Sequence, residues 1–249
     1  MTSTTAVVGL GEVGGPLLEA IERTGVPTTG IDVDTVAYPA PGTVEVMHVC
    51  FPFEIEDFVG EATRYIELLA PALTIVNSTV AVGTTRAIRE RTGTPVAYSP
   101  VRGKHAKMLQ ELTSYVKYVG ADDAEIARQA AAHFKSLGMR TKIVGSSETA
   151  ELTKLSETTY FALLIAWAQT VDRWCDEVDA DYDEVVSFYD EIPFFPPVKY
   201  FPGVIGGHCA MPNIELLART HDSPFLDAIR DSNGQKMASE HTAEPTLSR

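Results

Sequence analysis

The chain has 249 residues, of which 45% are hydrophobic and 22% are charged, which is enough for one large domain or two small domains with a buried core. Its formal net charge of −14 argues against a nucleic-acid-binding surface, which needs clusters of basic side chains. No apolar run reaches about 18 residues, so the sequence predicts no membrane span.

Cellular location and metal content are predicted from short patterns. The start, MTSTTAVVGLGEVGG, lacks the basic region and the cleavage site of a signal peptide. The three cysteines have no framework spacing. Both features favour a reducing, cytoplasmic setting. Because the sequence holds neither CxxC nor HExxH, it indicates no metal site.

Three glycines join the first predicted strand, Ala6–Gly11, to the first predicted helix. The pattern GxGxxG comprises Gly9, Gly11, Glu12, Val13 and Gly14. A strand before it and a helix after it are the context in which this pattern binds a dinucleotide. The first glycine makes the turn, the second lets a pyrophosphate approach, and the third lets the helix pack on the strand. The helix N-terminus then faces the phosphates with its positive end.

Asp32 ends the second predicted strand, about 20 residues after the second glycine. A carboxylate there is expected to bind the adenosine ribose and to favour NAD over NADP, because it repels a 2′-phosphate. The alternative is an ordinary turn residue after a strand.

Further strands alternate with helical segments, which is typical of an open, mainly parallel, doubly wound sheet. The predicted strands are Val44–Phe53, Leu73–Val80, Pro95–Val101, Tyr115–Gly120 and Thr141–Gly145, and the helices are Glu54–Ala70, Val82–Thr92 and Ala124–Leu137. Ligands bind such sheets at the carboxyl ends of the strands. The candidate cofactor-binding residues there are Phe51, Pro52, Ser78 and Thr79.

Other polar residues of this region are more ambiguous. His48 and Cys50 lie within a predicted strand and are interpreted as packed core residues rather than ligands. Arg102, Lys104 and His105 form a small basic group after the fifth strand and are predicted to meet an anionic group of the substrate. The alternative is that they are solvated loop charges.

A long helix is predicted from Ser146 to Asp179, because this segment has no Pro or Gly and its apolar residues wrap more than one face. It would connect two domains or two copies of the chain. We therefore expect a cofactor domain over residues 1–145 and a small all-α domain over residues 146–240. Residues 241–249 are expected to form a disordered tail. The later helices are predicted at Asp181–Glu191, Asn213–Arg219 and Phe225–Ala238.

The segment YFPGVIGGHCAMPN places Cys209 after two glycines and His208. A cysteine on such a loop can act as a nucleophile if its surroundings activate it. The alternative is a buried thiol beside a tight turn. His208 could assist the chemistry or serve only as a hydrogen-bonding residue.

With these residues considered together, the chain resembles the UDP-glucose/GDP-mannose dehydrogenase family, and in particular its nucleotide-aminosugar branch. Six segments match in order: GLGEVGGPL, NSTVAVGTT, YSPVRG, AELTKLSETTY, FPGVIGGHC and AIRDSNGQKM. The resemblance implies a Rossmann domain, a long central helix, a helical domain that forms a homodimer, and NAD-dependent oxidation of an alcohol. It also implies a short form without the family's C-terminal nucleotide-sugar-binding domain.

The resemblance implies roles for four residues. Cys209 matches the cysteine that attacks an aldehyde intermediate, and Lys154 matches the lysine that stabilises oxyanions and handles the proton. Thr79 matches a threonine that holds the catalytic water. Arg230 matches an arginine that reaches the substrate. The alternatives are a surface ion pair for Lys154 and for Arg230, and a strand-end hydroxyl for Thr79.

Departures from the family pattern are equally informative. Asn213 stands where the family has an aspartate, and Thr158 stands where it has an asparagine. Val101 replaces a glutamate that assists hydrolysis. Since an amide cannot serve as a base, the hydrolytic half of the family reaction is expected to be impaired.

Three functions therefore remain open beside the unmodified four-electron reaction. The first is a two-electron, NAD-dependent oxidoreductase acting on a CH–OH group of a sugar, polyol or nucleoside-like substrate. The second is a redox-neutral epimerase or C–C lyase with tightly bound NAD. The third is a non-catalytic module that binds NAD or a partner.

Overall fold

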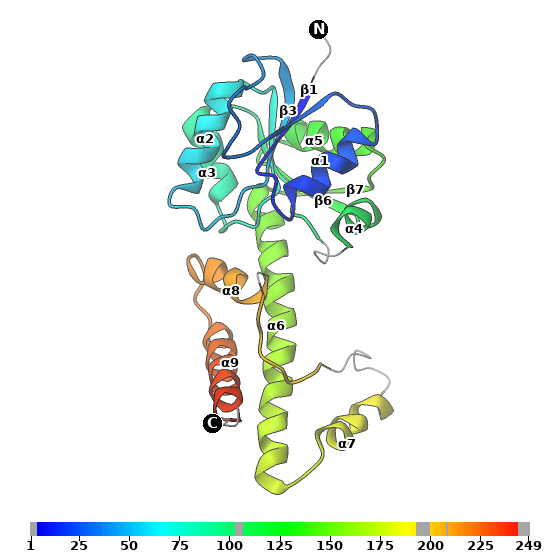
Figure 1. Ribbon diagram of the computed structural model, residues 1–249, viewed down its shortest axis with the longest axis vertical. Helices are drawn as coiled ribbons and strands as arrows, with labels where there is room; N and C mark the ends of the chain where they lie inside the picture. Colours follow the sequence, from blue (N-terminus) through cyan, green and yellow to red (C-terminus); the bar gives the residue numbers. More distant parts are fainter. Residues whose placement is uncertain (1–3, 103–106, 193–199, 208, 244–249) are drawn as a thin grey trace, which may run out of the picture. The chain divides into compact units, whose positions relative to one another are not determined.

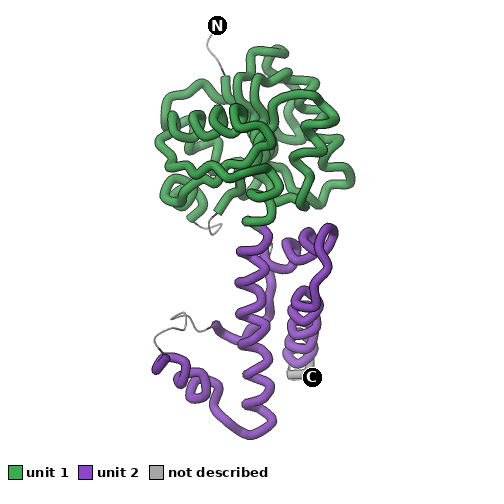
Figure 2. Tube along the Cα trace, turned by 180° about the vertical axis from the view of Figure 1, so that it is seen from behind, with its two compact units in different colours: residues 1–154 green, residues 155–249 purple. Residues whose placement is uncertain are grey.

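The computed structural model of the chain describes residues 4–102, 107–192, 200–207 and 209–243. It divides into two compact units, residues 1–154 and residues 155–249 (Figure 2). The helix α6 (Ser147–Val178) belongs to both, because the division falls after Lys154. Its start is capped by Ser146, whose Oγ accepts a hydrogen bond from the Thr149 amide at 3.1 Å.

Within the described residues, the first unit is built on a seven-stranded sheet in the order β2-β1-β3-β4-β5-β6-β7. The strands are β1 (Thr4–Val8), β2 (Thr28–Ile31), β3 (Val44–Val49), β4 (Leu73–Val76), β5 (Val96–Tyr98), β6 (Lys117–Gly120) and β7 (Thr141–Val144). Neighbouring strands pair in parallel, except that β5 and β6 are antiparallel. The predicted doubly wound, mainly parallel sheet is therefore confirmed, with its switch point between β1 and β3.

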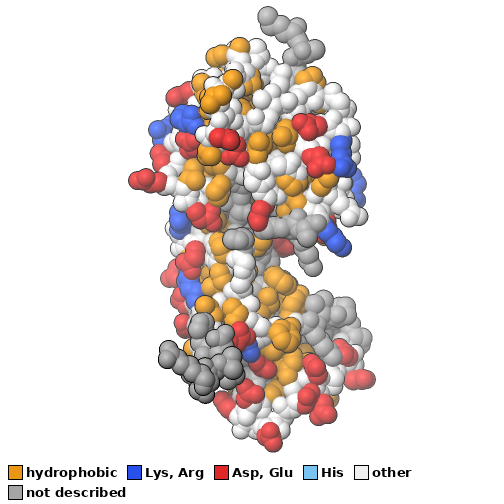
Figure 3. Space-filling view, in the orientation of Figure 1, with side chains coloured by type: hydrophobic (Ala, Val, Ile, Leu, Met, Phe, Trp, Pro, Cys, Tyr) orange, Lys and Arg blue, Asp and Glu red, His pale blue; other side chains and the backbone are white. Residues whose placement is uncertain are grey.

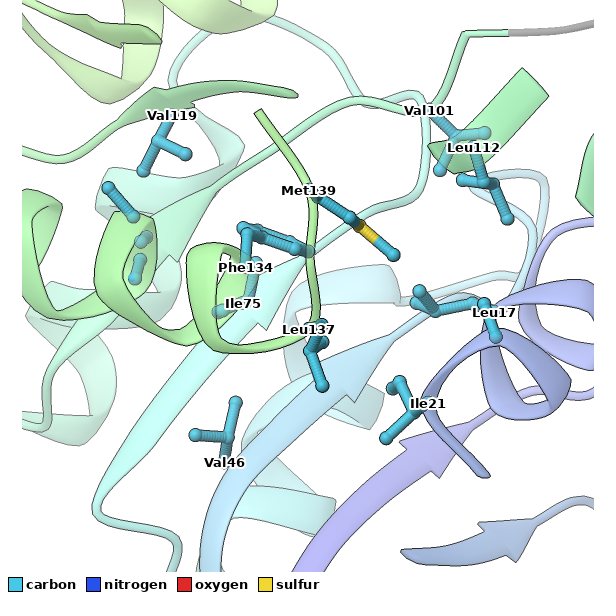
Figure 4. Close-up of a cluster of buried hydrophobic side chains, with 14 of the residues drawn as sticks. Leu17, Ile21, Val46, Ile75, Val101, Leu112, Val119, Phe134, Leu137 and Met139 are labelled. Carbon is cyan, nitrogen blue, oxygen red and sulfur yellow. The ribbon is translucent and has the colours of Figure 1, made fainter. Parts of the chain in front are cut away.

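Helices cover both faces of this sheet (Figure 1). One face carries α1 (Gly14–Glu22), α4 (Met108–Ser114) and α5 (Ala124–Ser136), and the other carries α2 (Phe58–Leu69) and α3 (Thr84–Thr92). Figure 4 shows the core on the α1 and α5 side, where Leu17 and Ile21 point toward Leu137 and Met139. The helix α4 was not predicted, since its short segment MLQELTS carries only two buried residues, Met108 and Leu112.

The second unit is all α-helical among the residues described, as predicted. After α6 it contains α7 (Tyr182–Ser187), the 3-10 helix η2 (Phe188–Glu191), α8 (Ala210–Ala218) and α9 (Pro224–Ala243). The prediction that α8 begins at Asn213 is wrong, because this helix already begins at Ala210. Pro212 lies in its first turn, where a missing N–H costs nothing, so the proline does not delay the start.

Candidate functional site

The glycine loop lies at the switch point of the sheet and is packed against the end of β3. Gly9 has a φ of +86°, and a Cβ on it would meet the Phe51 amide nitrogen at 2.6 Å. A Cβ on Gly14 would overlap the Gly9 carbonyl oxygen. Around Gly11, in contrast, no atom lies within 4 Å of the position of a Cβ. The fold itself thus requires Gly9 and Gly14, whereas Gly11 leaves open space for a ligand.

Asp32 lies directly beside this loop. Its Oδ2 accepts a hydrogen bond from the Leu10 amide at 2.9 Å, and its Oδ1 accepts one from the Val33 amide at 2.8 Å. Each carboxylate oxygen can accept a second hydrogen bond, so the side chain is oriented but not saturated. This arrangement suits a pair of ribose hydroxyls.

The ends of β3 and β4 meet at the same edge of the sheet. The Ser78 hydroxyl donates a hydrogen bond to the Phe51 carbonyl at 2.6 Å, and the Ser78 amide donates to Val49 O at 3.2 Å. Pro52 is exposed and Thr79 is half-buried beside them in the chain. The predicted residues Phe51 and Ser78 are therefore in contact, and Phe51 lies against the glycine loop.

The other two residues of the glycine pattern have different surroundings. Glu12 is exposed. Val13 precedes α1 and packs, partly buried, against the hydrophobic core on that face of the sheet.

Glu151 was not predicted as part of the site, although it holds one of its loops. This α6 residue is fully buried, and its carboxylate accepts hydrogen bonds from the Gly83 amide at 2.7 Å and from the Thr85 amide and hydroxyl at 2.9 and 2.6 Å. It thus caps the N-terminus of α3. Burial raises the pKa of Glu151. The feature of the sequence that could have revealed Glu151 is an acidic residue among apolar residues at the start of the long helix.

A buried polar chain lies behind the strand ends. The Asn77 amide donates to Ser99 O at 2.7 Å, so its Oδ1 accepts from His48 Nδ1 at 2.8 Å. His48 Nε2 must then accept from His133 Nε2, 2.9 Å away. Burial lowers the pKa of His48 well below its usual value and that of His133 to about 4. The interpretation of His48 as a core residue is consistent with its complete burial.

Lys117 is a second buried group that the sequence did not reveal. Its Nζ donates to Pro100 O at 3.1 Å and lies 5.0 Å from the centre of the Phe134 ring. Burial, together with the charge of Lys154 and against an opposing effect of Cys50, lowers the pKa of Lys117 to about 8. Cys50, buried nearby, has a pKa raised to about 12 by burial.

The candidate anion-binding residues of the first unit are described only in part. Arg102 is exposed, and its guanidinium carbon lies 5.5 Å from the centre of the Tyr115 ring. Lys104 and His105 lie outside the described residues. Lys154 is half-buried on α6.

In the second unit, Cys209 is exposed and directly precedes α8. The other two cysteines, Cys50 and Cys175, are buried. His208 lies outside the described residues. Among the three thiols of the chain, only that of Cys209 is accessible and lies at the positive end of a helix dipole.

The two departures Asn213 and Thr158 are hydrogen-bonded to each other. Asn213 Nδ2 donates to Thr158 Oγ1 at 2.9 Å, and the Thr158 hydroxyl donates to Leu155 O at 3.1 Å. Both side chains are buried. The two replacements therefore form one pair that ties α8 to α6, rather than two independent changes.

Arg230 is occupied by carboxylates in the second unit. Its Nε and Nη2 donate to Glu215 at 2.8 and 3.0 Å, and its Nη1 donates to Asp227 at 3.0 Å. These pairs match the surface ion-pair alternative for this residue. An anionic ligand at Arg230 would have to compete with both carboxylates.

The described residues limit the metal content and the membrane contacts of the protein. No group of three or more His, Cys, Asp or Glu residues there could bind a metal ion. In that same part of the chain, no helix has the length and hydropathy needed to cross a membrane.

Comparison with known proteins relates these features to a family. Residues 148–235 match the central domain of the UDP-glucose/GDP-mannose dehydrogenase family. A UDP-N-acetyl-D-mannosamine dehydrogenase from Methanococcus maripaludis is 30% identical over 164 residues, which are 65% of this chain and 38% of that protein. The chain thus spans well under half the length of this relative.

Solved structures share the fold. UDP-D-ManNAc dehydrogenase from Pyrococcus horikoshii superposes with a TM-score of 0.81 at 21% identity, over 96% of this chain and 70% of that one. A 3-hydroxyisobutyrate dehydrogenase from Mycobacterium tuberculosis, solved with L-serine, gives a TM-score of 0.72 at 18% identity, over 97% and 95%. At these identities the likeness is one of fold: a Rossmann-type unit followed by a long helix and a helical unit.

Proposed function

We propose that the chain belongs to the UDP-glucose/GDP-mannose dehydrogenase family, whose central domain its residues 148–235 match, and that it is an NAD-dependent oxidoreductase acting on a CH–OH group of a sugar, polyol or nucleoside-like substrate. The observation that carries this proposal is the glycine loop at the switch point between β1 and β3, with the Asp32 carboxylate hydrogen-bonded to it. That combination is the one a dinucleotide requires.

The residues of this loop fit NAD. A pyrophosphate would approach the backbone at Gly11, where an added Cβ meets no atom within 4 Å, and would face the positive end of α1. Asp32 would accept hydrogen bonds from the ribose hydroxyls. Phe51 and Pro52 would border the cofactor at the end of β3, and Ser78 would hold them there through its bond to the Phe51 carbonyl.

The chemistry then needs a base and a group that orients the carbonyl. When bound, NAD supplies the hydride acceptor. Lys154 in its neutral form accepts the proton of the substrate hydroxyl, so the alcohol becomes a carbonyl and loses two electrons. Thr79 orients a water. The Cys209 thiolate can add to the carbonyl carbon, and the oxygen then takes up a proton.

The Asn213–Thr158 pair supports a reaction in which the full four-electron turnover of the family is impaired. An amide that donates to a threonine hydroxyl cannot take a proton from water. Loss of a general base costs about 10²–10⁴ in rate, which would leave thioester hydrolysis slow.

The substrate is expected to carry an anionic group. Arg102 and His105 are the candidates for binding it in the first unit. Arg230 is the candidate in the second unit, where it would first have to exchange a carboxylate partner. The curated relative is named for UDP-N-acetyl-D-mannosamine, so this compound is the first probe. Sugars and polyols without a nucleotide are the second set of probes.

The test measures NADH formed per substrate consumed. One NADH per substrate, lost in Lys154→Met, is the expected result. Two NADH per substrate would show the unmodified family reaction. Full NAD occupancy released by denaturing the purified protein, with no net reduction, would identify a redox-neutral enzyme. Absence of NAD affinity would contradict both enzymatic functions.

The proposal includes a homodimer in a reducing, cytoplasmic setting, formed through α6. Tyr160, Trp167 and Trp174 are spaced seven residues apart along one stripe of this helix and are 55%, 49% and 51% exposed. The two indole rings meet edge to face, with centroids 5.6 Å apart. Figure 3 shows hydrophobic side chains gathered on the second unit, with acidic ones around them.

Exposed aromatic surface of this kind usually marks an interface. Light scattering should give twice the monomer mass for the native chain. Trp167→Glu should give the monomer. A native monomer would contradict the dimer without affecting the redox proposal.

A further inference from the structure

The loop before Cys209 needs an external support. Residues 200–207 form neither helix nor strand, and Gly206 and Gly207 stand directly before His208 and the cysteine. Gly207 has a φ of +77°, a conformation that glycine adopts readily. Glycines lose more conformational entropy on ordering than other residues, so such a segment stays in place only if other groups hold it.

Asn233 of α9 provides the first support by pairing with the peptide of Ile205 in both directions. The Ile205 amide donates to Asn233 Oδ1 at 2.7 Å, and Asn233 Nδ2 donates to Ile205 O at 3.1 Å. Both residues are 4% exposed. The side-chain amide thus occupies the position that a neighbouring strand would take, away from competing water.

Gln169 of α6 provides the second support, two residues earlier in the loop. Its Nε2 donates to Gly203 O at 2.8 Å and lies 3.3 Å from Asn233 Oδ1. The Ser232 hydroxyl donates to Gln169 Oε1 at 2.9 Å, which sets the orientation of the glutamine amide. Gln169 has no exposed surface.

The other side of the cysteine is held as well, since α8 is tied to α6 through Asn213 and Thr158. Cys209 therefore stands between two anchored segments, with only the glycines and His208 between it and the amide clamp.

We propose that Asn233 and Gln169 are positioning residues for Cys209: they fix Ile205 and Gly203 and thereby set the sulfur at the N-terminus of α8. The importance of this for turnover rests on the proposed function. The placement of the thiol does not depend on it and can be measured directly.

The measurement is the alkylation rate of Cys209 by iodoacetamide in the folded protein, followed by mass spectrometry. Cys209 is the exposed thiol of the three, so the modified site can be assigned. In Asn233→Ala the rate should fall about two- to fivefold, because the Cys209 side chain is then no longer held in one orientation at the positive end of α8. Asn233→Asp keeps the acceptor for the Ile205 amide and should recover part of the rate. NAD affinity should stay unchanged.

Gln235→Ala, at an exposed position of α9, is the matched control and should keep the native rate. If Asn233→Ala does not fold, the alkylation rate of Gln169→Met tests the inference instead, because methionine fills the same space but cannot donate to Gly203 O. A folded Asn233→Ala or Gln169→Met protein that is alkylated at the native rate would overturn the inference. If instead Cys209→Ser keeps full turnover while these rates change, the catalytic role of the thiol fails and the positioning stands.

Discussion

The two regions that carry the candidate chemistry are held in place in different ways. In the first unit, the glycine loop is fixed by the backbone, since Gly9 lies against Phe51 and Asp32 binds the Leu10 amide. In the second unit, the loop before Cys209 is fixed by the side chains of Gln169 and Asn233, which come from two helices. The cofactor region should therefore respond mainly to backbone crowding, and the thiol region to loss of single polar groups.

The largest effect is expected from Lys154→Met, which should separate the chemistry from the binding of NAD. Removing the proposed base should lower the rate of NAD reduction about 10²–10⁴-fold. NAD affinity, measured by fluorescence titration, should stay within about twofold of the native value, because the glycine loop is untouched. Lys135→Met, on the exposed side of α5, is the control. A parallel loss of NAD affinity would show that Lys154 supports the fold instead.

Lys117→Met tests whether the buried amine of Lys117 makes the free energy of unfolding depend on pH. The folded pKa of Lys117 is about 8, against 10.5 for an ordinary lysine. Between these values the unfolded chain keeps a proton that the folded chain releases, so the native free energy of unfolding rises with pH. Below pH 8 Lys117 is charged in both the folded and the unfolded chain, so burying the charge lowers the free energy of unfolding by its full amount.

The variant should therefore be more stable than the native protein at pH 7, by up to about 3 kcal/mol, and the difference should vanish near pH 10.5. Denaturant unfolding at several pH values measures it. An equal difference at all pH values would mean that Lys117 acts through packing with Phe134 rather than through charge.

Two glycine substitutions separate fold from binding inside one loop. Gly14→Ala places a Cβ on the Gly9 carbonyl and 3.0 Å from Cys50 Cβ, so it should lower the free energy of unfolding by about 1–3 kcal/mol. Gly11→Ala meets no protein atom and should change stability by less than about 0.5 kcal/mol. It should nevertheless weaken NAD binding about tenfold. Thermal unfolding with and without NAD distinguishes the two variants. Equal losses of stability in the two apoproteins would refute the separate roles of Gly14 and Gly11.

The smallest expected effect comes from Asn213→Asp in the second unit. A carboxylate cannot donate to Thr158, whose hydroxyl already donates to Leu155 O, so stability should fall by about 1–2 kcal/mol. Adding Thr158→Asn supplies a new donor and should restore at least half of this loss. Additive losses in the double variant would show that the two positions are independent. A second NADH per substrate in the double variant would locate the missing base.

The patterns that sequence analysis detected were mostly local. The GxGxxG loop and Asp32 are defined by residues next to one another or by the end of a strand, so the proposed cofactor-binding edge of the sheet could be inferred from spacing alone. The long helix α6 followed from the lack of Pro and Gly over some 30 residues. The match of six collinear segments indicated the family and drew attention to Lys154 and Cys209.

The contacts that sequence analysis missed join distant residues. Glu151 is 66 positions from Thr85, and Asn233 is 28 positions from Ile205. A glutamate or an asparagine on a helix usually faces water, and its sequence neighbours do not show when it faces a backbone instead. The sequence likewise did not show that Asn213 and Thr158, which each depart from the family pattern, are hydrogen-bonded to each other.

By itself, then, the sequence determined the doubly wound sheet, the glycine loop between its first strand and first helix, and the position of a cysteine just before α8, because these depend on periodicity, glycine geometry and order along the chain. Only the tertiary structure decided that Gly11 but not Gly14 has room for a Cβ, that Lys117 is a buried amine, and that Cys209 follows a loop clamped by Asn233. Those properties depend on which polar groups are excluded from water together, and that is set by packing between elements far apart in the chain.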